Sequence, residues 1–319
     1  MNFDLTNLPP GFIDDPHPHY AALRAEAPVH ELPTGGLFLS RHADLLRVYK
    51  DRAVFSSDKK VEFRPKFGDS LLYEHHTTSL VFNDAPLHTR VRRAIAGALS
   101  PRAIAGMDSV VKTLVDGLIG ELENRLETGR TIDAVADFAQ NIPIEVIGNL
   151  LAIPRHERDP LRDWSLAILG ALEPEISAAQ FEHGETAVRD FLAYLERLVA
   201  RRRAEGLDSA TDIMARLIRE TGAAGEDANL LPHELLQNCI FILNAGHETT
   251  TNLICSGIWL LSQHPRIVER LNADPDLWPA AVEEILRMES PNQLGNRRAL
   301  SAFEMGGRIW PEETLITLG

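Results

Sequence analysis

The chain has 319 residues, 44% of them hydrophobic, and a formal net charge of −14. This length and apolar content suffice for a large core, and the acidic balance argues against a nucleic-acid partner, because the chain would repel phosphates. No basic and apolar leader opens the sequence and no apolar run of about 18 residues occurs, so we expect a cytoplasmic protein without a membrane span. We also expect a monomer.

The first 80 residues have a mixed pattern. A helix is predicted over 18–26, short strands over 29–33 and 36–40, and a second helix over 43–50. Residues 56–80 are polar and rich in histidine, and we interpret them as a long loop of the kind that often carries function.

From residue 86 to residue 288 the sequence predicts helices almost throughout. Apolar residues recur at spacings of three and four in each segment. The segments are 87–99, 102–128, 134–151, 155–171, 177–204, 208–220, 232–263 and 275–289. The pattern changes after Pro291, where 306–318 predicts a small β-hairpin region. The predicted fold class is therefore mainly α with small β-sheets.

The longest predicted helix contains a polar stretch, residues 245–250 (Ala-Gly-His-Glu-Thr-Thr), between apolar flanks. Glycine inside a helix costs about 1 kcal/mol relative to alanine, so a stretch that breaks the rules of a buried helix indicates a functional site. Ala245 and Gly246 would open a notch, with the Thr249 hydroxyl one turn further on and Glu248 as a buried ionisable group. The alternative is a close helix–helix crossing in which threonines bond back to the preceding turn.

Two apolar residues, Ile242 and Leu253, share the predicted stripe of the notch and are candidates to line a substrate pocket. A zinc-protease motif is excluded, because His247-Glu248 would require a second histidine at position 251, which is Thr251.

Charged residues at helical spacing occur in two other segments. Glu284 and Arg287 lie three residues apart among apolar neighbours, which predicts a partly buried pair. His88 and Arg92 lie four apart and suit an anionic group such as a carboxylate. The alternative for His88 and Arg92 is a solvated basic face.

Together these patterns resemble soluble bacterial cytochrome P450 proteins over essentially the whole chain. The resemblance rests on the order and spacing of four motifs, since none is decisive alone. In chain order they are His88-x-x-x-Arg92, residues 245–250, Glu284-x-x-Arg287 and Arg297-Arg298, in which Arg297 has the better register. The resemblance implies one domain over 1–319 with the cytochrome P450 fold: a long central helix, a helical bundle and a small β region.

The resemblance also implies a function. It implies a monooxygenase that uses haem b to insert oxygen into a hydrophobic small molecule, with electrons from a ferredoxin or flavoprotein. Thr249 would hydrogen-bond dioxygen, and Glu248 would relay protons as a general acid. Ala245 and Gly246 would leave room for haem and dioxygen. The residues implied to bind the haem propionates are His88, Arg92 and Arg297.

Arginines near the helix at 87–99 form a predicted basic patch, although the chain is acidic overall. The patch consists of Arg90, Arg92, Arg93 and Arg102 and would suit docking of an acidic electron donor. The alternative is that these arginines are scattered and solvated.

The sequence contains two cysteines, Cys239 and Cys255. On one helix they would lie about 24 Å apart, too far for a disulfide. The family's haem iron is held by a cysteine thiolate in a loop of the form F-x-x-G-x-H-x-C-x-G, and neither cysteine has that context. The resemblance thus implies that the C-terminal haem-thiolate region is missing. The alternative function is a truncated, non-catalytic fragment or a haem-free binder of a hydrophobic ligand.

Overall fold

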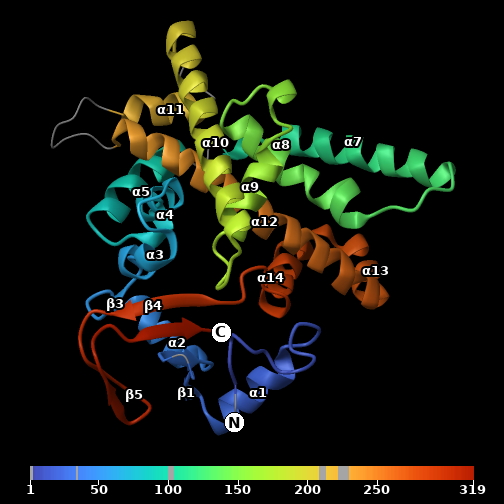
Figure 1. The fold of residues 1–319 in the computed structure, drawn as a ribbon. Helices are drawn as coiled ribbons and strands as arrows, with labels where there is room; N and C mark the ends of the chain where they lie inside the picture. Colours follow the sequence, from blue (N-terminus) through green and yellow to red (C-terminus); the bar gives the residue numbers. More distant parts are fainter. Residues whose placement is uncertain (1–2, 34, 100–103, 208–212, 222–229) are drawn as a thin grey trace. The chain divides into compact units, whose positions relative to one another are not determined.

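A computed structural model describes residues 3–33, 35–99, 104–207, 213–221 and 230–319 of the chain (Figure 1). The chain divides into two compact units. The sheet unit comprises Met1–Lys66, Val81–Asp84 and Asn292–Gly319. The helical unit comprises Phe67–Leu80 and Ala85–Pro291.

The sheet unit is built on a five-stranded sheet of order β1-β2-β7-β4-β3. Its strands are β1 (Val29–Glu31), β2 (Leu37–Leu39), β3 (Phe55–Ser56), β4 (Gly295–Ala299) and β7 (Leu315–Leu318). Strands β2 and β7 run parallel, and the other neighbouring pairs are antiparallel. A separate antiparallel hairpin joins β5 (Phe303–Met305) to β6 (Arg308–Trp310).

Alternating side chains give this sheet two apolar faces. Leu37 and Leu39 of β2 belong to one core cluster, to which α2 (His42–Lys50) contributes Val48. Phe38, between them in sequence, belongs to a second cluster with Leu23 of α1 (His17–Glu26). Helix α3 (Lys60–Phe67) begins in the sheet unit.

The helical unit contains the long helix α12 (Pro232–Gln263). Its other α-helices are α4 (Leu71–Thr78), α5 (Leu87–Ala98), α7 (Asp108–Glu127), α8 (Asn141–Leu150), α9 (Leu161–Gly170), α10 (Ala178–Glu205), α11 (Ile213–Glu220), α13 (Pro265–Ala273) and α14 (Trp278–Met288). A π-helix, η2 (Ala134–Ala139), precedes α8, and short 3₁₀ turns are η1 (Leu80–Phe82), η3 (Arg155–Glu157) and η4 (Pro275–Leu277).

Helix α12 crosses the helical unit (Figure 1) and contacts α4, α8, α9, α10, α13 and α14. Its N-terminal half is buried on most sides, as Leu235, Cys239, Ile240 and Leu243 show by their near-zero exposure. A helix that is apolar around its circumference is stable only inside such a bundle. Among the described residues, no helix has the length and apolar content needed to cross a membrane.

The mainly α fold with small sheets is confirmed, and the predicted segment 232–263 coincides with α12. The interpretation of 56–80 as a loop is wrong, because helices α3 and α4 both lie within it. Helix α13 was not predicted, although Pro265 lies in its first turn, where proline is favoured. The predicted segments 102–128 and 208–220 begin partly outside the described residues.

Candidate functional site

The polar stretch 245–250 lies at the middle of α12 and is partly open to solvent. Ala245 and Glu248 are exposed, and Gly246 and Thr249 are partly buried. The expectation that Glu248 is a buried ionisable group is therefore wrong: it lies on the side of α12 that faces away from the packed helices. An exposed carboxyl can exchange protons directly with water.

Both features of a close helix crossing are also present. A Cβ added at Gly246 would lie 2.7 Å from Cδ1 of Ile147 on α8, so the glycine allows this close approach. The Thr249 hydroxyl donates to the Ala245 carbonyl oxygen at 2.7 Å, and the Thr251 hydroxyl donates to that of His247 at 2.9 Å. The space beside Gly246 is thus filled by the Ile147 side chain of α8. Ala245 and Glu248 lie on the exposed side of the stretch.

His247 lies on the opposite, buried side of the stretch. Its side chain is almost fully enclosed, and Nδ1 lies 3.3 Å from Oγ of Ser165 on α9. Burial, with a smaller contribution from Arg162, lowers the pKa of His247 to about 4. The ring is therefore neutral near pH 7 and belongs to the core between α9 and α12.

The predicted carboxylate-binding residues His88 and Arg92 both lie on α5. Arg92 is exposed and His88 is partly buried. The apolar face of α5, which includes Val91 and Ile95, is buried. The helix therefore presents Arg92 away from its packed face.

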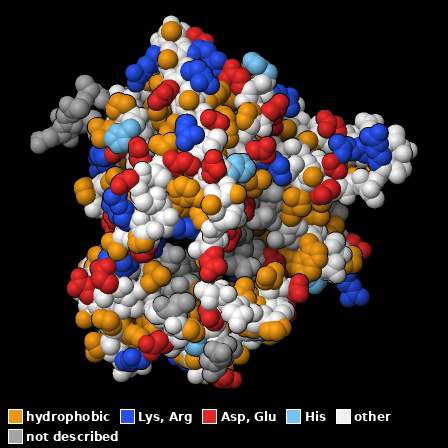
Figure 2. Space-filling model, in the orientation of Figure 1, with side chains coloured by type: hydrophobic (Ala, Val, Ile, Leu, Met, Phe, Trp, Pro, Cys, Tyr) orange, Lys and Arg blue, Asp and Glu red, His pale blue; other side chains and the backbone are white. Residues whose placement is uncertain are grey.

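Arg90 does not belong to a free basic patch. Its guanidinium donates to both carboxylate oxygens of Glu234 at 2.5 Å, and Glu234 also accepts from the Leu231 amide at 2.9 Å. Glu234 sits in the first turn of α12, so this pair joins α5 to the start of the long helix. Arg102 lies outside the described residues. Among the described arginines of the predicted patch, Arg92 and Arg93 are the exposed ones. Figure 2 shows acidic and basic side chains interspersed on the visible face of the helical unit.

Glu284 and Arg287 form the expected pair on α14. Arg287 donates through Nε and an amino nitrogen to the two carboxylate oxygens at 2.7 and 2.6 Å. The expectation of partial burial is wrong, because the two side chains are 55% and 68% exposed. The hydrogen bond from Arg287 lowers the pKa of Glu284.

Arg297 and Arg298 lie on β4 in the sheet unit and have different surroundings. Arg298 binds Glu313 at 2.5 Å and lies 3.7 Å from Glu62. Among the described residues Arg297 forms no ion pair. Its guanidinium donates to the Asn296 carbonyl oxygen at 2.7 Å and lies 4.9 Å from the centre of the Tyr49 ring. Arg297 is therefore the one of the two whose charge is not paired with a carboxylate among the described residues.

The two cysteines lie on α12 and are poor candidates for a thiolate ligand. Burial raises the pKa of Cys239 to about 12. Burial and, to a lesser extent, Asp133 also raise the pKa of Cys255. Both side chains are thus protonated thiols near pH 7, and neither lies in the F-x-x-G-x-H-x-C-x-G context of the family's axial cysteine.

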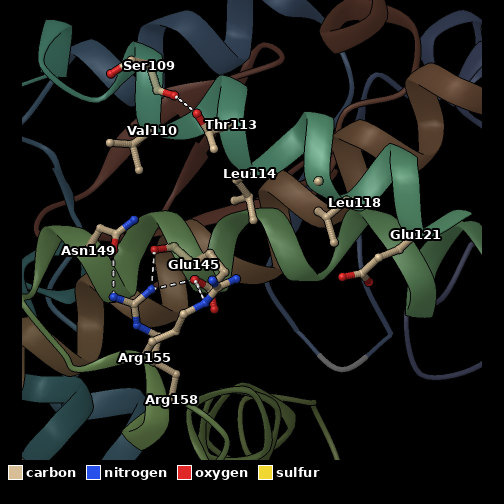
Figure 3. A pocket seen from close by; sticks show the side chains of 11 residues that line it. Ser109, Val110, Thr113, Leu114, Leu118, Glu121, Glu145, Asn149, Arg155 and Arg158 are labelled. Carbon is tan, nitrogen blue, oxygen red and sulfur yellow. Dashed lines mark hydrogen bonds and ion pairs between the residues drawn. The ribbon is translucent and has the colours of Figure 1, made fainter.

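A groove of about 590 Å³ lies between α7 and α8 (Figure 3), and no residue of the polar stretch of α12 lines it. Its most buried charge is Arg158, whose five N–H groups donate to Glu145, Asn149 and the Ile153 carbonyl oxygen. Because these donors are satisfied within the protein, the groove offers no free buried cation and is not the candidate site.

The predicted site residues therefore occupy four places, one of which is α14 with the Glu284–Arg287 pair. Helix α12 carries Ile242, Ala245, Gly246, Glu248, Thr249 and Leu253, and helix α5 carries His88 and Arg92. The Arg90–Glu234 pair joins these two helices. Arg297 belongs to the sheet unit. Sequence reasoning missed the contribution of Glu234, although a glutamate three residues after the N-cap residue, here Leu231, is a known N-terminal signal.

Comparisons with known proteins give consistent results. A model of the family "Cytochrome P450" matches residues 174–319. The chain is 31% identical over 312 residues to the cytochrome P450 monooxygenase PikC of Streptomyces venezuelae, covering 97% of this chain and 71% of PikC. It is 31% identical over 312 residues to vitamin D(3) 25-hydroxylase of Pseudonocardia autotrophica, covering 97% and 73%. The crystal structure of CalO2 matches with a TM-score of 0.87 and 28% identity, covering 99% of this chain and 76% of CalO2.

Proposed function

The chain belongs to the cytochrome P450 family, and from that premise we propose that it takes part in haem-dependent oxygen insertion into a hydrophobic small molecule. The family consists of haem monooxygenases, and haem b is its cofactor. The observation that carries the proposal is the exposed polar face of α12 at Ala245, Glu248 and Thr249, on a helix that is otherwise largely packed.

The residues of this chain fit the carboxylates of haem b. Arg297 is a desolvated guanidinium without a carboxylate partner among the described residues, which suits an incoming anion. His88 and Arg92 on α5 are the further residues proposed to hold a carboxylate. When bound, haem supplies the chemistry of dioxygen activation.

Glu248 and Thr249 are proposed to handle protons. Glu248 is exposed and can take protons from water, which suits a general acid. The Thr249 hydroxyl donates to the Ala245 carbonyl oxygen, so its oxygen lone pairs remain able to accept a hydrogen bond from a donor beside it. The two groups are neighbours in sequence and would move protons from solvent to the reacting oxygen.

The substrate is proposed to be hydrophobic. Ile242 and Leu253 are partly exposed apolar residues on the same stripe of α12 as Thr249, and a vitamin D(3) 25-hydroxylase is among the relatives. An apolar lining favours burial of an apolar molecule over a polar one. A ferredoxin or flavoprotein is the proposed electron donor, and the cytoplasmic, monomeric state expected from the sequence stays a prediction.

The axial thiolate is the part of the haem site that these residues do not fit. Cys239 and Cys255 lie on α12 and lack the sequence context of the family's axial cysteine, so neither is proposed as that ligand. The second candidate function is a non-catalytic protein that binds a hydrophobic ligand without haem.

The carbon-monoxide difference spectrum of the reduced protein, after loading with haem, separates the two functions. The monooxygenase proposal requires the Soret band of thiolate-ligated haem. A haem-loaded protein without that band would rule out monooxygenase activity for these 319 residues and leave the non-catalytic binder.

A further inference from the structure

Tyr49 and Arg297 make a close contact within the sheet unit. The carbon at the centre of the Arg297 guanidinium lies 4.9 Å from the centre of the Tyr49 ring, within the range of a cation–π interaction. Tyr49 lies in the last turn of α2, and Arg297 lies on β4. The contact therefore links Arg297 on the strand to α2. Helix α2 is itself anchored, because its Val48 packs in the core of the same unit.

Gly295 makes this contact possible. It precedes Arg297 by two residues on β4, so the two positions share one face of the sheet. A Cβ at position 295 would overlap the Tyr49 hydroxyl and lie 3.2 Å from Cζ of its ring. The tyrosine thus lies directly against the strand backbone, and any side chain at position 295 would push it away.

Arg297 is held in a state suited to binding an anion. Burial lowers the pKa of Arg297, while Tyr49 and Asp84 act in the opposite direction. One amino nitrogen is engaged by the Asn296 carbonyl oxygen. The adjacent Arg298 differs, because Glu313 and Glu62 lie within ion-pair distance of its guanidinium.

We propose that Tyr49, seated on Gly295, is a positioning residue that holds the Arg297 guanidinium ready for a carboxylate of the ligand. The inference rests on the proposed function, in which Arg297 binds a carboxylate of haem b. Fixing a long side chain before binding reduces the entropy lost on binding. The aromatic ring is the part that acts, so phenylalanine should replace tyrosine and leucine should not.

The test uses the full chain with two porphyrins, protoporphyrin IX and its dimethyl ester, which lacks the carboxylates. Binding is followed by porphyrin fluorescence. Tyr49→Leu is expected to weaken binding of the diacid about 2- to 5-fold, the range for a cation–π contact at a partly exposed site, and to leave ester binding unchanged. Tyr49→Phe is expected to bind both porphyrins as the native chain does.

Gly295→Ala supplies an independent variant that leaves Tyr49 and Arg297 in the sequence. Gly295→Ala is expected to weaken diacid binding to the same extent as Tyr49→Leu. The double variant is expected to bind the diacid no more weakly than either single variant, because both substitutions remove the same Tyr49–Arg297 contact. Additive losses, or equal losses for diacid and ester, would overturn the positioning role in favour of a general effect on the fold.

Arg297→Met separates this inference from the proposed function. If Arg297→Met binds the diacid as tightly as the native chain, the carboxylate role of Arg297 fails. If Arg297→Met loses diacid binding and Tyr49→Leu does not, only the role of Tyr49 fails. Nuclear magnetic resonance of the Arg297 Nε–H group decides the role of Tyr49 without any porphyrin. The group is expected to be ordered in the native chain and in Tyr49→Phe and mobile in Tyr49→Leu, and an ordered group in Tyr49→Leu overturns the proposal.

Discussion

At the scale of single residues, Thr249 shows how one side chain serves both a structural and a proposed catalytic purpose. Its hydroxyl bonds back to Ala245 within α12, a contact that contributes little to helix stability. Thr249→Ala is therefore expected to leave the thermal midpoint nearly unchanged, because alanine has the higher helix propensity. In the haem-loaded protein it is expected to divert electrons to hydrogen peroxide, measured as peroxide formed per electron supplied. Thr249→Ser keeps the hydroxyl and serves as control, and unchanged coupling in Thr249→Ala would remove the assigned role.

Glu234 is a second residue with a definable role, because its side chain is only 3% exposed. Burial alone would raise the pKa of Glu234, but the hydrogen bonds from Arg90 and the Leu231 amide outweigh it, and the pKa lies below 4.5. Glu234→Gln is expected to lower the free energy of unfolding by roughly 2–3 kcal/mol, less than for a fully buried pair because Arg90 is 31% exposed.

The pH dependence of this effect follows from the lowered pKa of Glu234. The stabilisation is complete above about pH 4.5 and is lost as the pH falls through the native pKa, so the difference between native and variant should disappear in acid. Urea unfolding at several pH values measures it, with the exposed Glu123→Gln as control. A difference that persists in acid would assign the loss to packing and not to charge.

At the scale of elements, the helices were predicted best where their own sequence decides them. The bounds of α12 follow from Pro232 at its start and His264-Pro265 after its end. Helices α3 and α4 were missed, because their sequences are polar and their helical state depends on partners. The first amides of α4, at Leu71 and Leu72, donate to Glu185 of α10, which is distant in sequence.

The end of α8 is a testable case of packing between elements. A Cβ at Gly148 would overlap the guanidinium of Arg158, which binds the Glu145 and Ile153 carbonyl oxygens there. Gly148→Ala is expected to destabilise the protein by about 1–3 kcal/mol through overpacking. The matched control is Gly120→Ala on α7, where the added Cβ meets nothing within 4 Å and a gain of about 0.5–1 kcal/mol is expected from helix propensity. Thermal or urea unfolding distinguishes them, and similar effects for both would contradict the role of Arg158.

At the scale of the whole molecule, two buried histidines predict acid lability. Burial lowers the pKa of His75 to about 4, against an opposing hydrogen bond with Gln237, and burial lowers that of His247 to about 4. Since the unfolded chain binds these protons near pH 6.5, stability is complete above that pH and falls as the pH drops towards 4, by about 3 kcal/mol for each histidine. His75→Gln and His247→Gln should each flatten the stability–pH curve in this window, whereas the exposed His264→Gln should not. A native curve that is flat from pH 6.5 to 4 would be incompatible with neutral, buried histidines.

Surface charge provides the second prediction at this scale. Arg93 is exposed beside Arg92, while Arg90 is engaged by Glu234. Arg93→Glu is expected to slow reduction by an acidic electron donor several-fold at low salt and little at high salt, because exposed charges are screened. Stopped-flow reduction measures this rate, with Arg266→Glu on α13 as an exposed control of the same charge change. Equal effects of both variants would assign the slowing to net charge and not to docking near α5.

By itself the sequence determined the family, the mainly helical class, the span of α12 and the residues of the candidate site, because helical spacing and short motifs are local properties. Only the tertiary structure decided how those residues are used: Glu248 is exposed, Gly246 accommodates Ile147, Arg90 is engaged by Glu234 and Arg298 by Glu313. Burial and ion pairing depend on residues far apart in the chain. The physical environment of a charge was therefore the part that no local pattern could predict.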